Sequence, residues 1–390
     1  MRQFKVAAAA LGLVIGVLAA APASAWNRGN VQVLTVLPDL INQPGVKSSV
    51  EGITVGPDGN IYVPSFGFNT TKPGTPGAIS GSANLFVISP NGKIVNQVII
   101  TCTNCPQGVQ VSSSMLGLRF NPVNQHLWLL DFFAGLVLDL GVSPVTGHST
   151  LLAGPIAGSA LNALTFDKNG NGYVSDSFNG VIWKVPLSGG ASIWKADPLL
   201  GNGGGALTPP FGANGVEFSN DGSTLFVANT AFHQIIQIPV NTDGSAGTAS
   251  IFITGINAPD GIAIDSNNNM WICANQEDEI VVIDNSGKVI AKLGDFGGID
   301  ENGIARGLLF PASLAFSNDG STLYVSNLTL YLPSAGPLSL IETGESWGLD
   351  VDYTVAARAN CHAPAIDATR TAPPLPARSD SGIARAGGAT

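Results

Sequence analysis

The sequence of 390 residues predicts an all-β fold, a six-bladed β-propeller whose blades are four-stranded antiparallel sheets. Three observations support this prediction. A hairpin pattern occurs six times, its copies lie about one blade length apart, and no helical periodicity separates the strands. The last observation argues against a parallel sheet, because a parallel crossover needs a long connection that is usually a helix.

The hairpin pattern is clearest at residues 213–229, which read ANGVEFSNDGSTLFVAN. Two runs of alternating apolar residues flank Asn220-Asp221-Gly222, which supplies the positive φ angles of a tight turn. In chain order, the six copies begin at Gly52, Gly117, Ala163, Gly215, Gly261 and Ser313. The spacings of 65, 46, 52, 46 and 52 residues fit blades of four short strands.

Two further features concern the connections and the closure of the ring. The long first spacing contains a Gly-, Pro-, Thr- and Ser-rich insertion at residues 66–84, which predicts a loop. A strand predicted at residues 31–36 has no blade of its own, whereas the sixth copy lacks a clear fourth strand. Pairing the two would close the ring and remove its free edges, although residues 351–356 compete for that place.

Both ends of the chain are predicted to lie outside the propeller, which we place at residues 26–357. Residues 1–25 have a basic start, an apolar run and the motif Ala23-Ser24-Ala25, as in a cleaved signal peptide. Residues 358–390 are rich in Ala, Pro and Arg and lack aromatic residues, which is typical of a disordered tail. We therefore expect an exported protein, periplasmic or secreted, with no membrane span.

Charge and cysteine content narrow the class of function. Cleavage of the signal peptide removes two cations and no acid, and so takes the net charge from −10 to −12. Such an acidic surface argues against nucleic acid as a partner, and we expect a monomer that acts on a small molecule. Cys102 and Cys105 form a loop staple, a redox pair or two free thiols, and Cys273 is expected in the core.

One position of the repeat carries most of the chemistry. It is the residue directly before the start of each copy, which we call the slot. Because equivalent positions of a propeller lie on a circle, the slot residues should meet at one mouth of the channel. Around the ring they are Glu51, Leu116, Asn162, Asn214, Asp260 and Ala312. Two carboxylates and two carboxamides are the ligands of a hard cation such as Ca²⁺. The alternative is that these side chains only assist turns and cap strands.

The slot residues and their neighbours also resemble a known family. Glu51-Gly52, Asn162, Asn214-Gly215 and Pro259-Asp260-Gly261 look like the calcium-binding positions of the senescence marker protein and gluconolactonase family and of diisopropyl-fluorophosphatase. The resemblance implies a six-bladed propeller that hydrolyses lactones or organophosphate esters with one divalent cation in its channel. It implies Glu51, Asn214 and Asp260 as direct metal ligands, and Asn162 as a ligand or a catalytic residue that positions substrate and water.

The implied mechanism uses the metal as a Lewis acid and Asp260 as general base or nucleophile on a lactone or ester. Sugar-lactonase members of the family carry Arg-x-Asn-Asp in the third blade, where this chain has Ala160-Leu161-Asn162-Ala163. The cation that would grip a sugar hydroxyl is therefore missing. Specificity for a sugar-acid lactone is not expected.

The loops at the same mouth should form the rim of the pocket. Their aromatic residues would favour a hydrophobic ester or lactone, unless they pack between blades: Phe68, Phe132, Phe133, Phe178, Phe232 and Tyr331. His233 either assists proton transfer or is an exposed loop residue. Five residues at one repeat position are interpreted as fixing turns: Asp131, Asp176, Asn229, Asn275 and Asn327.

Two other classes of function compete with the metal-dependent hydrolase. A non-catalytic exported propeller could bind a ligand or partner at the rim, because fold does not decide function. A metal-free enzyme similar to strictosidine synthase would need one catalytic acid and no cation ligands. The four oxygen donors of the slot favour the hydrolase over both.

We expect export to leave Trp26 as the first residue of the mature chain, because Ala23-Ser24-Ala25 ends the apolar run with a small-x-small cleavage site. Mass spectrometry of the secreted protein measures this directly. A mature mass that still includes residues 1–25 would contradict the prediction.

Overall fold

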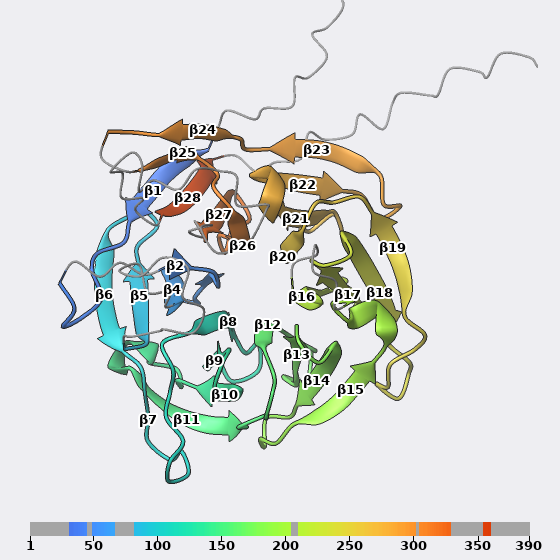
Figure 1. Ribbon diagram of the computed structural model, residues 1–390, viewed down its shortest axis with the longest axis horizontal. Helices are drawn as coiled ribbons and strands as arrows, with labels where there is room; N and C mark the ends of the chain where they lie inside the picture. Colours follow the sequence, from blue (N-terminus) through green and yellow to red (C-terminus); the bar gives the residue numbers. More distant parts are fainter. Residues whose placement is uncertain are drawn as a thin grey trace, which may run out of the picture.

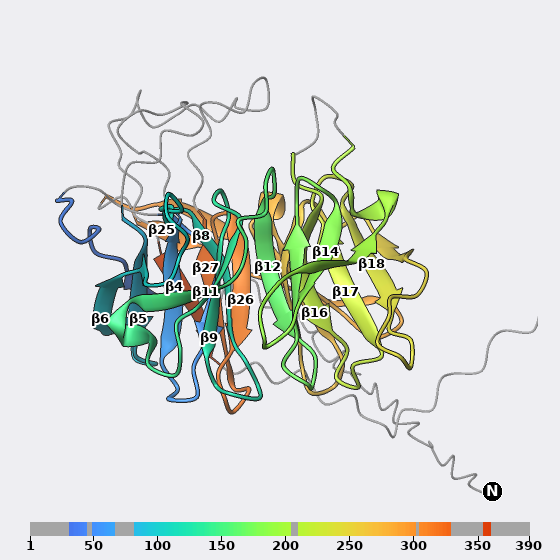
Figure 2. The same ribbon diagram turned by 90° about the horizontal axis from the view of Figure 1, so that it is seen from below.

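Six sheets surround a central channel, so the fold is the six-bladed β-propeller that the sequence predicts (Figure 1). The computed structural model describes residues 31–44, 49–66, 82–203, 210–301, 304–328 and 354–359. In the first five blades, the strands that form the blade follow one another outward from the channel in chain order. The connections between strands gather at the two faces of the ring (Figure 2).

The strands of the blades have the following bounds, from the channel outward. Blade one consists of β2 (Ser49–Val50), β3 (Thr54–Val55), β4 (Ile61–Phe66), β5 (Asn84–Ile88) and β6 (Ile94–Ile99). Blade two consists of β8 (Met115–Phe120), β9 (Leu127–Asp131), β10 (Leu136–Asp139) and β11 (His148–Ala153). Blade three consists of β12 (Leu161–Phe166), β13 (Gly172–Asp176), β14 (Val181–Val185) and β15 (Ser192–Ala196).

Blade four consists of β16 (Ala213–Phe218), β17 (Thr224–Asn229), β18 (Gln234–Pro239) and β19 (Ser250–Thr254). Blade five consists of β20 (Pro259–Ile264), β21 (Met270–Ala274), β22 (Glu279–Ile283) and β23 (Val289–Leu293). Blade six consists of β26 (Pro311–Phe316), β27 (Thr322–Asn327), β28 (Thr354–Ala359) and β1 (Gln32–Val36). A hairpin of β24 (Phe296–Ile299) and β25 (Ala305–Gly307) lies between blades five and six in the chain.

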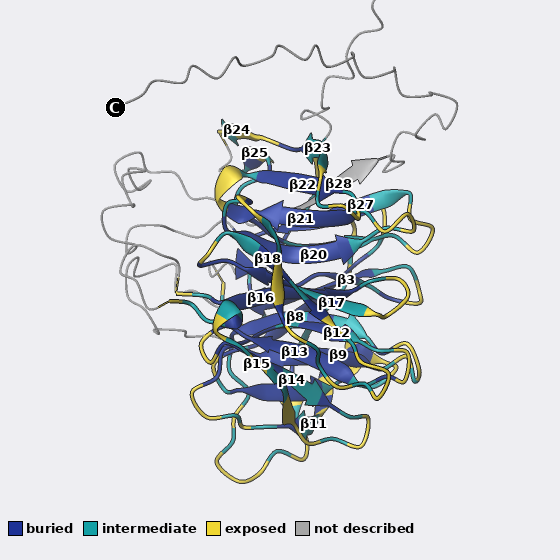
Figure 3. Cartoon of the chain, turned by 90° about the vertical axis from the view of Figure 1, so that its right-hand side faces the viewer, coloured by how far each residue is buried: buried dark blue, intermediate teal, exposed yellow. Residues whose placement is uncertain are grey.

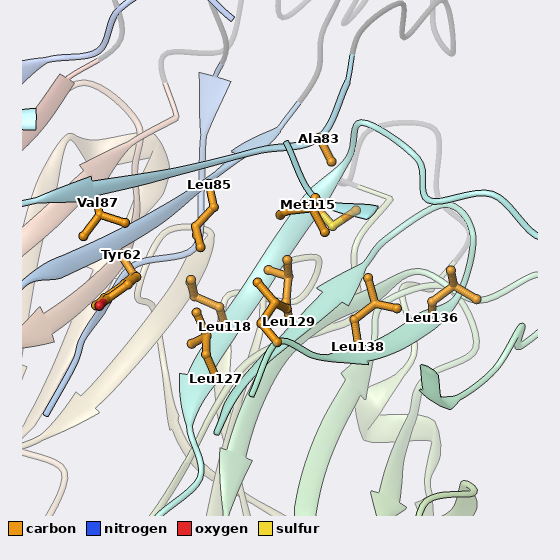
Figure 4. Close-up of a cluster of buried hydrophobic side chains, with 12 residues drawn as sticks. Tyr62, Ala83, Leu85, Val87, Met115, Leu118, Leu127, Leu129, Leu136 and Leu138 are labelled. Atoms are coloured by element: carbon orange, nitrogen blue, oxygen red, sulfur yellow. The ribbon is translucent and has the colours of Figure 1, made fainter. Parts of the chain in front are cut away.

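Apolar side chains hold the blades together, with one buried cluster at each of the six interfaces. Between blades one and two, Leu85 and Val87 of β5 meet Leu118 and Leu129 of β8 and β9 (Figure 4). Successive side chains of a strand point to opposite faces, so each blade can pack one face against each neighbour. The inner strands of the blades are accordingly buried, whereas exposed residues lie mainly in the connections and on the outermost strands (Figure 3).

Strands from both ends of the chain close the ring. β1 pairs with β28, and β28 pairs with β27, so β1 is the outermost strand of blade six. The sequence left residues 31–36 and 351–356 as alternatives for one place, but the structure uses a strand from each region. β28 runs to Ala359, beyond the end expected for the propeller at residue 357. The expected signal peptide, Trp26 and residues 360–390 lie outside the described residues.

The loops and cysteines largely follow the sequence analysis. β7 (Thr101–Cys102) adds a parallel strand to the outer edge of blade two, and Cys102 and Cys105 form a disulfide beside it. Cys273 is a buried free cysteine in β21, as expected for a core residue. Residues 67–81 of the insertion and Cys361 lie outside the described residues.

The described helices are three 3-10 turns: η1 (Pro144–Thr146), η2 (Pro198–Leu200) and η3 (Asn275–Glu277). In the part of the chain that the structure describes, none of these is long or apolar enough to cross a lipid bilayer.

Neighbouring inner strands approach so closely that most of them need glycine directly after the slot. A Cβ atom at Gly215 would lie 2.1 Å from the carbonyl oxygen of Asp260, and one at Gly52 would lie 2.0 Å from that of Leu116. Real Cβ atoms essentially never come within 3.0 Å of such an atom. Four glycines face the carbonyl of the next slot residue in this way: Gly52, Gly117, Gly215 and Gly261. These contacts set the diameter of the ring.

Gly215→Ala is expected to lower the free energy of unfolding by about 3 kcal/mol, because the new methyl group would overlap the backbone of blade five. Urea denaturation measures the loss. Gly201→Ala is the matched control, because its Cβ would lie 3.4 Å from the nearest atom and its φ is −75°. If Gly215→Ala were as stable as Gly201→Ala, the contact between Gly215 and Asp260 would not limit the packing of the blades.

Candidate metal centre

The slot residues lie where each inner strand becomes irregular. In β8, β12, β16, β20 and β26, the register with the next strand shifts across the slot. In blade one the inner strand is interrupted between β2 and β3, where Glu51 lies. Such bulges re-aim a side chain away from the regular alternation of a strand. All six slot residues are buried, and the glycine contacts link blades one to three and blades four to six at this level of the channel.

Glu51 and Asp260 are the two acids of this ring. Burial raises the pKa of Glu51 to about 8, and a hydrogen bond from the Asn162 side chain partly opposes the rise. Burial also raises the pKa of Asp260 well above its usual range, and the negative charge of Glu51 adds to it. Hydrogen bonds from Asn214 and Asn275 act in the opposite direction. Two interacting buried carboxyls of this kind favour a positively charged partner.

In the carboxamide of Asn214, the nitrogen has a hydrogen-bond partner and the oxygen has none among the described residues. Its Nδ2 donates a hydrogen bond to Thr230 Oγ1 at 2.9 Å. Its Oδ1 is buried and has no hydrogen-bond donor in the described part of the chain. An unsatisfied buried acceptor costs about 1–3 kcal/mol, so a cation or water bound at this oxygen would remove a real penalty.

Together these residues fit a hard divalent cation. Glu51 and Asp260 supply negative charge, while Asn162 and Asn214 supply neutral oxygen atoms, and Ca²⁺ prefers such ligands. Among the described residues, no three His, Cys, Asp or Glu side chains gather at one place. The donor set is therefore unlike the His- and Cys-rich sites that are typical of zinc.

Asn275 belongs to the site although the sequence groups it with turn-fixing residues. Its Nδ2 donates to Asp260 Oδ2 at 3.2 Å and to the carbonyl oxygen of Pro311 at 3.3 Å. Only the pairing of the hairpin could have indicated this role. Pro259 of β20, directly before Asp260, lies opposite Ala274 of β21, directly before Asn275. Asp131, Asp176 and Asn229 each accept a hydrogen bond from a backbone N–H three residues further on, as expected of residues that fix turns. Asn327 instead accepts from the backbone N–H of Leu309.

Comparison with known proteins points to one family. Residues 208–294 match the SMP-30/Gluconolactonase/LRE-like region, and this segment contains Asn214 and Asp260. Over this segment the chain is similar to this family. It is also 26% identical over 138 residues to lactonase Drp35 of Staphylococcus epidermidis, an alignment that covers 34% of this chain. The aligned part spans only 41% of the length of that relative.

Two solved structures show the same fold over most of the chain. The calcium-binding protein regucalcin of Agrobacterium tumefaciens has a TM-score of 0.52 and 17% identity, and the match covers 84% of this chain and 96% of that one. A gluconolactonase of Xanthomonas campestris has a TM-score of 0.53 and 14% identity, with coverage of 86% and 91%. At this level of identity the likeness concerns the fold alone.

The two slots without oxygen donors flank Glu51 around the ring and make that side of the mouth apolar. Leu116 and Ala312 are buried in one cluster with Phe66, Phe132 and Ala160. The sequence resemblance aligns Ala160 with the arginine of the third-blade motif of the sugar lactonases. A small apolar residue in a buried cluster takes its place here.

Phe132 is the centre of the aromatic rim. Its ring centroid lies 4.8 to 6.3 Å from four others: Phe66, Phe133, Phe178 and Phe211. Phe132 itself is buried, whereas Phe133, Phe178 and Phe232 are 49%, 44% and 39% exposed. The predicted rim therefore divides into a packed centre and exposed edges. Phe68 and Tyr331 lie outside the described residues.

His233 is half-buried and has a structural hydrogen bond. Its Nδ1 accepts from the backbone N–H of Ala258 at 2.9 Å, which lies two residues before Asp260. The acceptor nitrogen is thus already used by the backbone, and the exposed-loop interpretation does not hold either. His233 supports the connection that carries Asp260.

The channel below the slots contains a polar group that the sequence did not reveal. Arg119 of β8 forms an ion pair with Glu217 of β16, and Thr165 of β12 donates to Glu217 Oε1 at 2.9 Å. Arg119 and Glu217 line a cavity of about 390 Å³, and Thr165 of blade three is hydrogen-bonded to both of them. The guanidinium and carboxylate neutralise each other there, so this pair adds no net charge to the channel.

The chelated protein is expected to lose thermal stability between about pH 4.5 and 8, because folding raises the pKa of Glu51 from 4.5 to about 8. Above pH 4.5 the unfolded chain releases this proton while the folded chain still holds it, so unfolding becomes easier as the pH rises. Ca²⁺ should restore more stability at pH 8 than at pH 5. Melting curves with chelator and with Ca²⁺ measure both effects.

Glu51→Gln is the control for this measurement, since it removes one titrating group and should flatten the dependence. Asp221 and Asp319 have pKa values lowered to about 2, so they affect the pH dependence of stability below this pH range. If the melting temperature of the chelated wild type changed with pH as steeply as that of Glu51→Gln, Glu51 would have an ordinary pKa.

Proposed function

We propose that the protein is a calcium-dependent hydrolase of an apolar lactone or ester. One observation carries the proposal. Two interacting buried carboxyls and the unsatisfied oxygen of Asn214 share the ring of slots with an aromatic cluster. The lactonase relative in Staphylococcus epidermidis supports the reaction class, and the calcium-binding neighbour makes Ca²⁺ the first cation to test.

The four oxygen donors would hold the cation: Glu51, Asn162, Asn214 and Asp260. When bound, Ca²⁺ supplies a Lewis acid for the carbonyl oxygen of the substrate. Asn162, beside Glu51, is either one of these ligands or the group that orients substrate and water. Glu51 contributes its charge and, being buried, stays in place during the reaction.

Asp260 is proposed as the general base. Its carboxylate takes a proton from a water molecule, whose oxygen forms a bond to the carbonyl carbon. The bond from that carbon to the leaving oxygen then breaks, and the leaving oxygen receives the proton. Asn275 donates to Oδ2 of Asp260 and holds the carboxylate in one orientation. As a nucleophile, Asp260 would instead attack the carbonyl carbon itself.

The aromatic residues define the substrate class. Phe133 and Phe178 are exposed and pack on Phe132, which adjoins the apolar slot Leu116. An acyl chain or aryl group placed on these rings would bury apolar surface, at about 25 cal/mol per Å². This chain has Ala160, which cannot bind a sugar hydroxyl, at the position where the resemblance implies an arginine. A hydrophobic lactone or ester therefore suits the site better than a sugar-acid lactone.

Asp260→Asn is expected to lower kcat by at least about 10²-fold while the protein still binds Ca²⁺, because the amide keeps an oxygen ligand but cannot accept the proton. A panel of aryl esters and hydrophobic lactones, assayed with and without chelator, provides the rates. Calorimetric titration with Ca²⁺ provides the affinity.

Ala312→Ser changes a slot without a donor and is the control, which should keep both activity and calcium affinity. Full activity of Asp260→Asn would exclude Asp260 as base or nucleophile. A purified protein that contains no divalent cation and ignores chelator would instead favour the alternative, a propeller that binds a ligand at its exposed aromatic rim without catalysis.

We also propose that the protein acts as an exported monomer, periplasmic or secreted. The amino-terminal sequence supports export, and the acidic composition supports a small molecule over nucleic acid as partner.

A further inference from the structure

We propose that Thr230 is a positioning residue, which sets the orientation of the Asn214 carboxamide and so presents its oxygen to the cation. The inference rests on the proposed function, because Asn214 is a ligand of the proposed metal centre. Thr230 directly follows β17 and is 6% exposed. Its hydroxyl contacts groups of blades four and five, the two blades that carry Asn214 and Asp260.

The two hydrogen bonds of Thr230 allow only one arrangement of protons. Its Oγ1 lies 2.8 Å from the carbonyl oxygen of Pro259 and 2.9 Å from the side-chain amide of Asn214. A carbonyl oxygen can only accept, so the single hydroxyl proton points to Pro259. The hydroxyl is then an acceptor toward Asn214. The atom of Asn214 that faces it has to be the donor, Nδ2.

This arrangement determines which end of the carboxamide remains for a ligand. The nitrogen and oxygen ends of a carboxamide are similar in shape, and hydrogen bonds decide between its two orientations. With Nδ2 on Thr230, the oxygen occupies the other end, where it is buried and has no donor among the described residues. In the reverse orientation the oxygen would face the lone pairs of Thr230, and the amide protons would face the cation. Thr230 therefore holds Asn214 in the orientation that can bind metal, together with Asp260, which also accepts a hydrogen bond from the Asn214 side chain.

The same hydroxyl links the two ligands that Asn214 and Asp260 provide. Pro259 directly precedes Asp260 in β20, and Gly215 directly follows Asn214 in β16. A Cβ at Gly215 would lie 2.1 Å from the carbonyl oxygen of Asp260, so the two backbones are already in contact. Thr230 adds a hydrogen-bonded bridge between them. Groups that orient metal ligands in this way typically contribute about 10–100-fold to affinity.

Thr230→Val tests the inference, because valine keeps the shape of the side chain and removes the hydroxyl. Calorimetric titration of the full chain with Ca²⁺ is expected to show about 10–100-fold weaker binding. Thr230→Ser retains the hydroxyl and should restore affinity to within about threefold of the wild type. The calcium-induced rise in Tm is a second readout, and Thr230→Ala replaces Thr230→Val if the latter does not fold.

Ser177→Ala is the matched control. Ser177 holds the equivalent place after β13, and its hydroxyl donates to the carbonyl oxygen of Ala213 at 2.7 Å. Removing it breaks the same kind of bond between blades, but that bond ends on backbone and orients no slot carboxamide. We expect lower stability without weaker calcium binding.

A double-mutant cycle with Asn214→Asp separates orientation from stability. A carboxylate has oxygen at both ends, so nothing needs to be oriented, and adding Thr230→Val should then weaken Ca²⁺ binding much less than it does with Asn214. An equal loss in both backgrounds would overturn the inference. A Thr230→Val variant that binds Ca²⁺ as tightly as the wild type would also overturn the inference. If the wild type binds no Ca²⁺, the proposed function fails first, and the role of Thr230 fails with it.

Discussion

The close approach of neighbouring inner strands is the constraint on which the rest of the structure depends. Where a glycine follows the slot, the backbone of one blade touches the carbonyl group of the next, and no side chain separates them. The ring is therefore narrow enough for side chains from different blades to interact at its mouth, as Glu51 and Asp260 do. The same contact makes the site sensitive to residues that carry no chemistry, because a methyl group at Gly215 would displace blade five and Asp260 with it.

Chemical function is distributed unevenly around a ring that is geometrically regular. Blades one, three, four and five contribute oxygen atoms to the mouth, whereas blades two and six contribute Leu116 and Ala312. Because blades two and six are the neighbours of blade one, Glu51 lies between apolar slots. This accounts for burial as the main cause of its raised pKa. A cation bound there and an apolar group bound next to it would each find a suitable surface within one small mouth.

The sequence predicts the fold and the slot residues because both depend on the repeat. Six hairpins define six blades, and one repeat position then defines one ring of side chains. Thr230 and Asn275 could not be found in this way, because their roles depend on which atoms face each other across strands. Arg119 and Glu217 are separated by 98 residues, and only the assembled channel brings them together. The disulfide was one of several possibilities in the sequence, since spacing alone does not distinguish a staple from free thiols.

Blade six joins the two ends of the described propeller, and this bears on the order in which the chain can assemble. The first five blades are built largely from hairpins of consecutive strands, which can form as soon as their own residues are available. The pairing of Gln32 with Ala357 instead requires nearly the whole chain. Until then the ring has an open edge on blade five and another on blade one. A nascent chain therefore cannot complete its native ring until nearly all of its residues have been synthesised.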